Sequence, residues 1–250
     1  MRLFLMYYVL IAFYVILAMP SMTMNILPPC IVAPKTTFHD ACARGDRDAV
    51  KHYIEWADQV KWGVDKEAEL FDGIWSAVSL GHYSTVELLL DSGRIDINKK
   101  GLLSGSTLLH IAACAPPFQE ELESYHVCTA DLQAFKNIID LLLDKKADIN
   151  AMSFYDMTPL SCAVHRFAAM VPCDMTPLSR AAYRQALEII ELLISKKPKI
   201  ITKDRDDRTP LFYAALSRNK HIIELFSRID DAQVQSELQK EIAWRGHCEL

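Results

Sequence analysis

The 250-residue sequence lacks both a charge imbalance and low-complexity tracts. Lysine and arginine number 27 against 32 aspartates and glutamates, so the formal net charge is −5, and no run of five like charges occurs. Binding to nucleic acid needs a concentrated basic field, so the sequence predicts no nucleic-acid partner. Its 51% hydrophobic content instead predicts a folded chain with an apolar core.

Motifs for catalysis and metal binding are also missing. The sequence has no phosphate-binding loop, no GxGxxG and no CxxC pair. Its seven cysteines are odd in number and irregularly spaced, which favours buried or free thiols in a reducing compartment over a disulfide framework. The set Cys162, His165 and Cys173 falls short of the four ligands of a structural zinc site. We therefore expect no catalytic residue, no metal and no cofactor, and we interpret the chain as a non-enzyme.

Charge is absent from the whole stretch between Arg2 and Lys35. Residues 3–19 are almost continuously apolar, at the lower limit of length for a membrane span and slightly long for a signal peptide. We therefore expect membrane association or secretion, with residues 1–21 forming either an uncleaved anchor or a cleaved signal peptide. The proline-containing stretch 22–35 then forms a linker.

A motif that describes two short helices recurs along the rest of the chain. In its clearest copy Thr209 can cap a helix, and Pro210 suits the first turn because its missing N–H would be unpaired there. Ala214 and Ala215 are small enough to let this helix approach a neighbour closely. Residues 223–226 then supply the apolar face of a second helix.

The same order of residues recurs upstream. In four of the five copies the first cap and the Val or Ile of the second helix lie 14 positions apart, and Gly45 and Gly81 stand where a left-handed residue would end the first helix. The four upstream copies are Thr36–His39 with Val50, Asp72–Trp75 with Val86, Thr107–His110 with Ile139, and Thr176–Ser179 with Ile190.

This motif resembles the ankyrin repeat, whose core is T-P-L-H-x-A-A, then G, then V-x-x-L-L. Residues 93–98 and 146–150 likewise resemble the G-A-D-x-N stretch that leads to the next repeat. The resemblance implies an all-α solenoid of about five helix–turn–helix repeats over residues 36–228. The second copy departs from it by lacking the T-P-L-H box, and Gln185 and Arg218 occupy glycine positions. Residues 229–250 have an apolar residue every four positions, as expected of a helix that caps the last repeat.

Two repeats are longer than the others. From Thr107 to Ile139 the interval is 32, which exceeds 14 by 18, and the hexapeptide at 156–161 recurs 18 positions later at 174–179. Either both repeats carry an 18-residue insertion, with Thr176 starting an extended second helix, or 158–173 is a half-repeat before a regular repeat. With insertions, the expected repeats are 36–71, 72–106, 107–157, 158–208 and 209–228.

The resemblance implies a non-catalytic, monomeric protein-binding module that uses its turn tips, its first helices and the two insertions. Degenerate ankyrin proteins with such insertions resemble host-directed proteins of intracellular bacteria, so the chain is expected to be a secreted or membrane-tethered protein of this kind. Its expected partner is a protein. The alternative is an enzyme with a cysteine-based site built by the insertions. The expected partner-binding residues are Phe118, Tyr125, Phe154, Tyr155, Met157, Arg205, Asp206, Arg208 and Tyr213.

Overall fold

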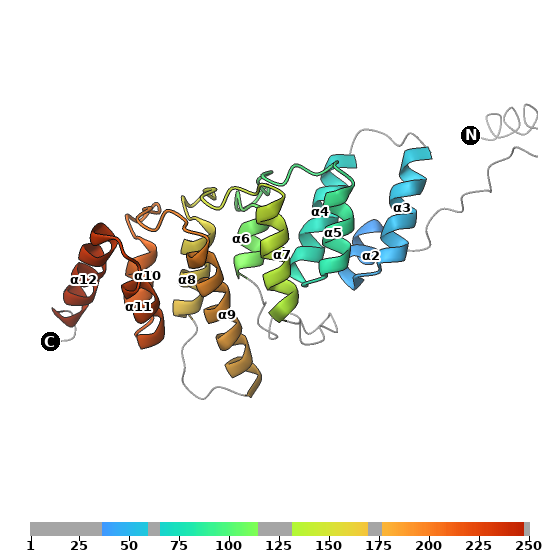
Figure 1. The fold of residues 1–250 in the computed structure, drawn as a ribbon. Helices are drawn as coiled ribbons and strands as arrows, with labels where there is room; N and C mark the ends of the chain where they lie inside the picture. The colour runs from blue at the N-terminus through green and yellow to red at the C-terminus, as the bar shows by residue number, and fades with distance from the viewer. Residues whose placement is uncertain (1–36, 60–65, 115–131, 170–176, 248–250) are drawn as a thin grey trace, which may run out of the picture. The chain divides into compact units, whose positions relative to one another are not determined.

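The computed structural model describes residues 37–59, 66–114, 132–169 and 177–247 (Figure 1). Contacts divide the chain into residues 1–33 and 34–250, and all the described residues belong to the second unit. Its described part contains 11 helices and no strand, which confirms the all-helical fold. No described helix is both long and apolar enough to cross a membrane, and residues 3–19 lie outside the described ranges.

The helices follow one another in pairs, and a further helix, α12 (Ala232–His247), follows the last pair. The pairs are α2 (Phe38–Arg44) with α3 (Arg47–Gln59), α4 (Lys66–Ser79) with α5 (Tyr83–Asp91), α6 (Leu108–Cys114) with α7 (Leu132–Asp144), α8 (Pro159–Ala169) with α9 (Pro177–Ser195), and α10 (Pro210–Leu216) with α11 (Lys220–Ser227).

Each pair packs on the next through helices of the same kind. The first helices form one row in which α2, α4, α6, α8, α10 and α12 contact each other in turn, and α3, α5, α7 and α9 form a second row. The described segments that lead from one pair to the next lie along one edge of this stack (Figure 1). Contacts between neighbouring pairs are typical of a repeat protein, in which each unit is stabilised by the units beside it.

The expected helix caps are present. Thr209 Oγ1 accepts a hydrogen bond of 3.3 Å from the N–H of Phe212, and Thr37 Oγ1 accepts one of 3.1 Å from Asp40. Gly45 ends α2 with φ 69°, and Gly81 has φ 76°, so both glycines adopt the predicted left-handed conformation. The local sequence signals therefore set where these helices begin and end.

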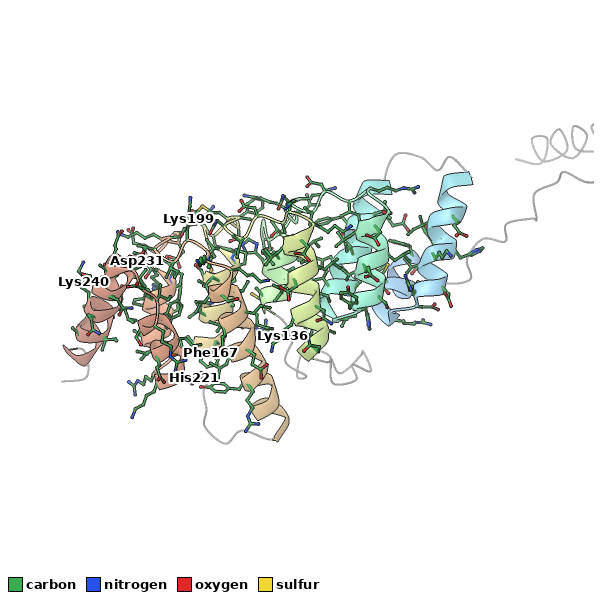
Figure 2. All side chains as sticks on the ribbon, viewed as in Figure 1. Lys136, Phe167, Lys199, His221, Asp231 and Lys240 are labelled. Atoms are coloured by element: carbon green, nitrogen blue, oxygen red, sulfur yellow. The ribbon has the colours of Figure 1, made fainter. Side chains whose placement is uncertain are left out.

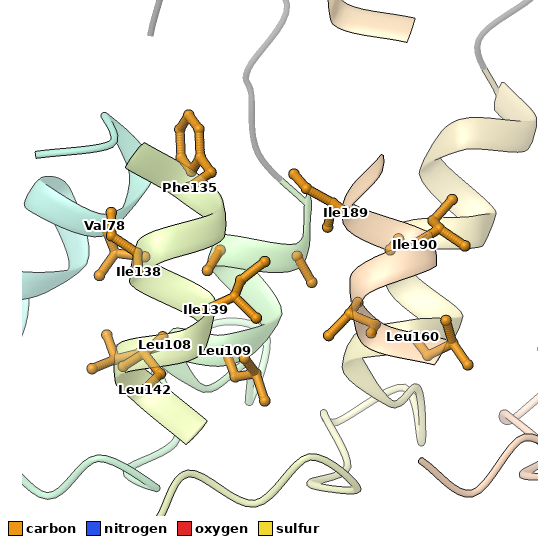
Figure 3. Packing of buried hydrophobic residues seen from close by; sticks show 14 of the residues in the cluster. Val78, Leu108, Leu109, Phe135, Ile138, Ile139, Leu142, Leu160, Ile189 and Ile190 are labelled. Carbon is orange, nitrogen blue, oxygen red and sulfur yellow. The ribbon is translucent and has the colours of Figure 1, made fainter. Parts of the chain in front are cut away.

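The core lies between the two rows of helices (Figure 3). Leu109 of α6, Ile139 of α7 and Ile190 of α9 are all fully buried. Replacing one buried leucine with alanine removes about 2–5 kcal/mol of stability in such a core. Ala112 and Ala214 are also fully buried, and their small side chains let neighbouring first helices approach.

α4 begins earlier than expected, and α9 is a long second helix, as in the interpretation that starts it at Thr176. α4 begins at Lys66, ahead of Asp72, because the intervening Lys, Glu, Ala and Leu are good helix formers and no proline or cap stops them. α9 is one continuous helix of 19 residues from Pro177 to Ser195, and it packs on α8. Gln185 therefore lies within a helix, and its assignment to the glycine position of a turn is wrong.

Three further residues take the place of glycines at helix ends. Lys146 follows α7 with φ 71°, Lys197 follows α9 with φ 57°, and Arg218 follows α10 with φ 55°. The left-handed conformation is strained for residues with a side chain, by roughly 1–2 kcal/mol each. The fold stores this strain at the ends of three described helices.

Candidate functional site

Three turns project from the edge that carries the connections between pairs. We call residues 101–106, 152–157 and 203–208 the tips, and they recur every 51 positions. The N–H of Phe154 donates to the carbonyl oxygen of Ser104 at 2.9 Å, and the N–H of Arg205 donates to the carbonyl oxygen of Tyr155 at 3.2 Å. The three tips are therefore joined to one another through their backbones.

Each tip is also held by bonds of its own. Asp204 Oδ1 accepts from the N–H groups of Asp206 and Arg208, both at 2.9 Å, and the N–H of Asp207 donates to the carbonyl oxygen of Asp204 at 3.0 Å. In the middle tip Ser153 Oγ accepts from two N–H groups at 3.3 Å in the same manner. These turns are ordered before any partner arrives, which lowers the entropy lost on binding.

Gly105 shows how closely two tips approach. It has φ 65°, and a Cβ atom added to it would lie 2.4 Å from the ring of Phe154. Asp156 and Asp207 take the equivalent positions of the next two tips with φ 57° and 60°. Glycine is required only at the first of these positions, because only there does an aromatic ring of the next tip fill the space.

Large apolar side chains lie exposed on the first two tips. Leu102 is 94% exposed and Leu103 97%, while Phe154 is 44% and Tyr155 58% exposed. The guanidinium of Arg205 lies 5.9 Å from the centre of the Tyr155 ring, within the range of a cation–π contact. We call these five residues the tip surface. Aromatic and arginine side chains that can be desolvated together are the usual anchors of protein interfaces.

The other expected partner-binding residues differ from one another in exposure. Asp206 and Arg208 are exposed, and their side chains lie 3.4 Å apart. Met157 is half-buried and turns its carbonyl oxygen towards His110. Phe118 and Tyr125, from the first insertion, lie outside the described residues.

Tyr213 differs from the expectation of an exposed turn residue, because its side chain is only 3% exposed. Its hydroxyl donates to Asp204 Oδ2 at 2.6 Å, and its ring meets His165 edge-on at 4.7 Å between centres. Burial, and then the bond to Asp204, raises the pKa of Tyr213 to about 12. Tyr213 therefore supports the third tip through its bond to Asp204 and is not part of the exposed surface of that tip.

Leu102 and Leu103 were not among the residues expected from the sequence. Two leucines stand between Gly101 and Gly105 in a segment without helical or strand periodicity, but this pattern does not say whether they are buried or exposed. Apolar residues in such a position usually enter a core, and only the fold shows that these two point to solvent.

Next to the tips, an asparagine side chain of one repeat accepts a hydrogen bond from the backbone of the next repeat. Asn98 Oδ1 accepts from the N–H of Asp148 at 2.8 Å, and Asn150 Oδ1 accepts from the N–H of Lys199 at 2.7 Å. Figure 2 shows Lys199 on the same edge as the connections between pairs. The asparagines align each tip with the one before it, which is a physical role for the N of the G-A-D-x-N stretch.

The second helices present a polar face to solvent. Lys145 binds Asp91 at 2.8 Å across α7 and α5, and Lys136, labelled in Figure 2, binds Glu188 across α7 and α9. These pairs are exposed enough that each contributes little to stability, about 0–1 kcal/mol. In contrast to the tip surface, this face offers charges that are already paired.

The described side chains also bear on metal binding and on cysteine chemistry. Within the described ranges, no group of three or more His, Cys, Asp or Glu side chains is placed to hold a metal ion. Cys42 is fully buried, and burial raises its pKa to about 12, so its thiol stays protonated and inert at neutral pH.

The C-terminal part of the described chain is similar to a known repeat family. The model of the family described as ankyrin repeats (3 copies) matches residues 165–236, from α8 to α12. This match covers less than half of the chain and places ankyrin-like repeats at residues 165–236. No curated protein matches the chain. Ankyrin repeats point to a module for interaction between proteins, and the family is generally non-catalytic.

Proposed function

We propose that the chain recognises a protein partner through the tip surface, as a non-catalytic monomer. The supporting observation is that hydrogen-bonded neighbouring tips expose Leu102, Leu103, Phe154 and Tyr155 together. Burying these exposed apolar side chains under a partner would lower the free energy of the complex. The side chain of Arg205 adds a planar group that can pair with a carboxylate of the partner while it stays on the Tyr155 ring.

The two insertions belong to the proposal as a second region of contact, on the strength of the sequence alone. Residues 115–131 and 170–176 lie outside the described ranges, so their contribution is tested by deletion. A chain that lacks 116–128 is expected to keep its melting temperature and to bind its partner more weakly. Full binding by the folded deletion variant would remove this region from the proposal.

Targeting by residues 3–19 is a further part of the proposal. The segment has no polar face and follows Arg2, as in a signal peptide or an anchor. An exported or tethered chain of this kind would present its repeats to a partner away from the producing cytoplasm, as expected of a host-directed protein.

Site-specific photo-crosslinking tests the main proposal. A photoreactive phenylalanine is placed at Leu103 or Tyr155, and at the matched control position Glu191, which is exposed on α9. The partner identified by mass spectrometry is expected from both tip positions and not from Glu191. Crosslinking of the same partner from Glu191 alone would contradict the proposal.

Affinity provides the second measurement. The double variant Leu103→Ser and Tyr155→Ala should weaken binding by about 10-fold or more, the effect expected of an interface anchor. The control Glu191→Ala should bind as the wild type does. Unchanged affinity of the folded double variant would place the interface elsewhere on the chain.

A further inference from the structure

Two cysteines from neighbouring first helices meet in the stack. Cys114 is the last residue of α6, and Cys162 lies in the first half of α8, the helix that packs beside α6. Their side chains are hydrogen-bonded to each other, and both are free thiols and partly exposed. Cys42 of α2 is fully buried by comparison. Among the described cysteines, Cys114 and Cys162 are the two with partial solvent exposure.

The surroundings make the two thiols unequal. The bond with Cys162 is the main cause that lowers the pKa of Cys114, and the positive charge of Arg166 adds to it against the opposing effect of burial. The same bond, with burial, raises the pKa of Cys162. Thiolate is the nucleophilic form of cysteine, so Cys114 reacts first and Cys162 stands ready as the second thiol.

We propose that Cys114 and Cys162 form a redox pair that hydrogen peroxide converts into a disulfide between α6 and α8. The Cys114 thiolate attacks one oxygen of the peroxide and breaks the O–O bond, which leaves a sulfenic acid and a hydroxide that takes up a proton to become water. Cys162 then attacks the Cys114 sulfur and displaces the hydroxyl group, which leaves as water with the Cys162 proton. The sum consumes two thiols and one peroxide and gives one disulfide and two waters.

This modification is separate from partner recognition at the tips. It covalently ties the third and fourth described helix pairs together through their first helices. A dithiol reductant reverses it by thiol–disulfide exchange. A cross-link between segments far apart in sequence restricts the unfolded chain, so the oxidised form should melt at a higher temperature.

Peptide mapping tests the proposal on the full-length chain in mild detergent. The reduced protein is treated with hydrogen peroxide, its remaining thiols are blocked with N-ethylmaleimide, and the digest is analysed without reduction. The expected product is a peptide pair joined through Cys114 and Cys162, which dithiothreitol separates again. No cross-link in the folded chain, or a mixture of cross-links in which this pair does not predominate, would overturn the proposal.

Single variants test the order of the two steps. In Cys162→Ser, Cys114 should stop at the sulfenic acid and be labelled by dimedone, whereas in Cys114→Ser, Cys162 should label several-fold less. Cys42→Ser is the matched control and should form the disulfide as the wild type does. Circular dichroism establishes that each variant is folded, and alanine replaces serine in any that is not. Equal dimedone labelling of the two variants would reject the assignment of Cys114 as the nucleophile, and disulfide formation in either of them would reject the pair itself.

Discussion

The Nε2 atom of His110 lies 2.9 Å from the carbonyl oxygen of Met157, a residue of the next tip. The other ring nitrogen accepts from the N–H of Thr107 at 3.2 Å, so Nδ1 carries no proton and Nε2–H donates to Met157. The neutral imidazole thus bridges two successive helix pairs. The histidine of the T-x-x-H motif links its own helix start to the following repeat.

Acid should weaken this bridge. Burial is the main cause that lowers the pKa of His110, with a smaller effect from Lys100, and the bond to Met157 only partly opposes them. The unfolded chain therefore binds a proton more readily than the folded chain, so the free energy of unfolding falls as the pH drops below about 6.5. Urea unfolding at several pH values measures this loss.

The variant His110→Gln keeps a donor and an acceptor but does not titrate. Its stability is expected to depend less on pH than that of the wild type. The control His221→Gln changes an exposed histidine and should keep the wild-type dependence. Identical pH profiles for His110→Gln and wild type would contradict the assigned role.

Glycine at position 146 should stabilise the protein. Lys146 has φ 71° two residues after the end of α7, and glycine adopts this conformation without the clash of a Cβ atom. The replacement Lys146→Gly is expected to raise the free energy of unfolding by roughly 1 kcal/mol. Lys136→Gly, in the middle of α7, should lower it by about 1 kcal/mol, because glycine is unfavourable within a helix. Thermal denaturation distinguishes the two.

A larger side chain at Ala214 should disturb the stacking of first helices. Ala214 is fully buried in α10, which packs between α8 and α12. Ala214→Leu is expected to destabilise the chain by about 1–3 kcal/mol through overpacking. Ala232→Leu adds the same atoms at an exposed site on α12 and should be nearly neutral. The analogous replacement at Ala181 is predicted from the sequence only, because its side chain lies outside the described ones.

Two charges in the apolar N-terminal segment should abolish membrane targeting. The double variant Val9→Arg and Phe13→Arg interrupts residues 3–19, and arginine is costly to insert into a bilayer, by about 2.5–3.5 kcal/mol each. Fractionation should then find the chain in the soluble pool. Ser236→Arg with Gln239→Arg, two exposed positions of α12, is the control and should stay with the membrane. A wild-type chain that is wholly soluble at full length would show that the segment neither anchors nor targets it.

Local signals in the sequence were sufficient for much of the fold. Thr209 with Pro210, and Gly45 after its short helix, identify helix ends through bonds made within a few residues. The left-handed conformations of Lys146 and Lys197 could not be found in this way, because lysine does not favour them. At the end of α7, the N–H groups of Lys146 and Ala147 donate to the carbonyl oxygens of Leu143 and Leu142 at 3.0 and 2.9 Å, and residue type alone does not predict this turn.

The candidate site was predictable only in part for a similar reason. Phe154 and Tyr155 follow a recognisable stretch of the repeat and are exposed, as a turn implies. The burial of Tyr213 depends on a hydroxyl bond to Asp204 and on contact with a neighbouring helix, which no periodicity reveals. The meeting of Cys114 with Cys162 is likewise a product of how α6 and α8 stack.

The backbone bonds between tips also couple binding to bending. A change in the angle between neighbouring helix pairs would stretch the bond from Phe154 N to Ser104 O or that from Arg205 N to Tyr155 O, because each bond spans one junction. A partner that contacts all three tips would restrict the angle between neighbouring helix pairs at both junctions. Flexing of the stack, and with it the frequency of partial opening at these junctions, should therefore fall when the tips are occupied.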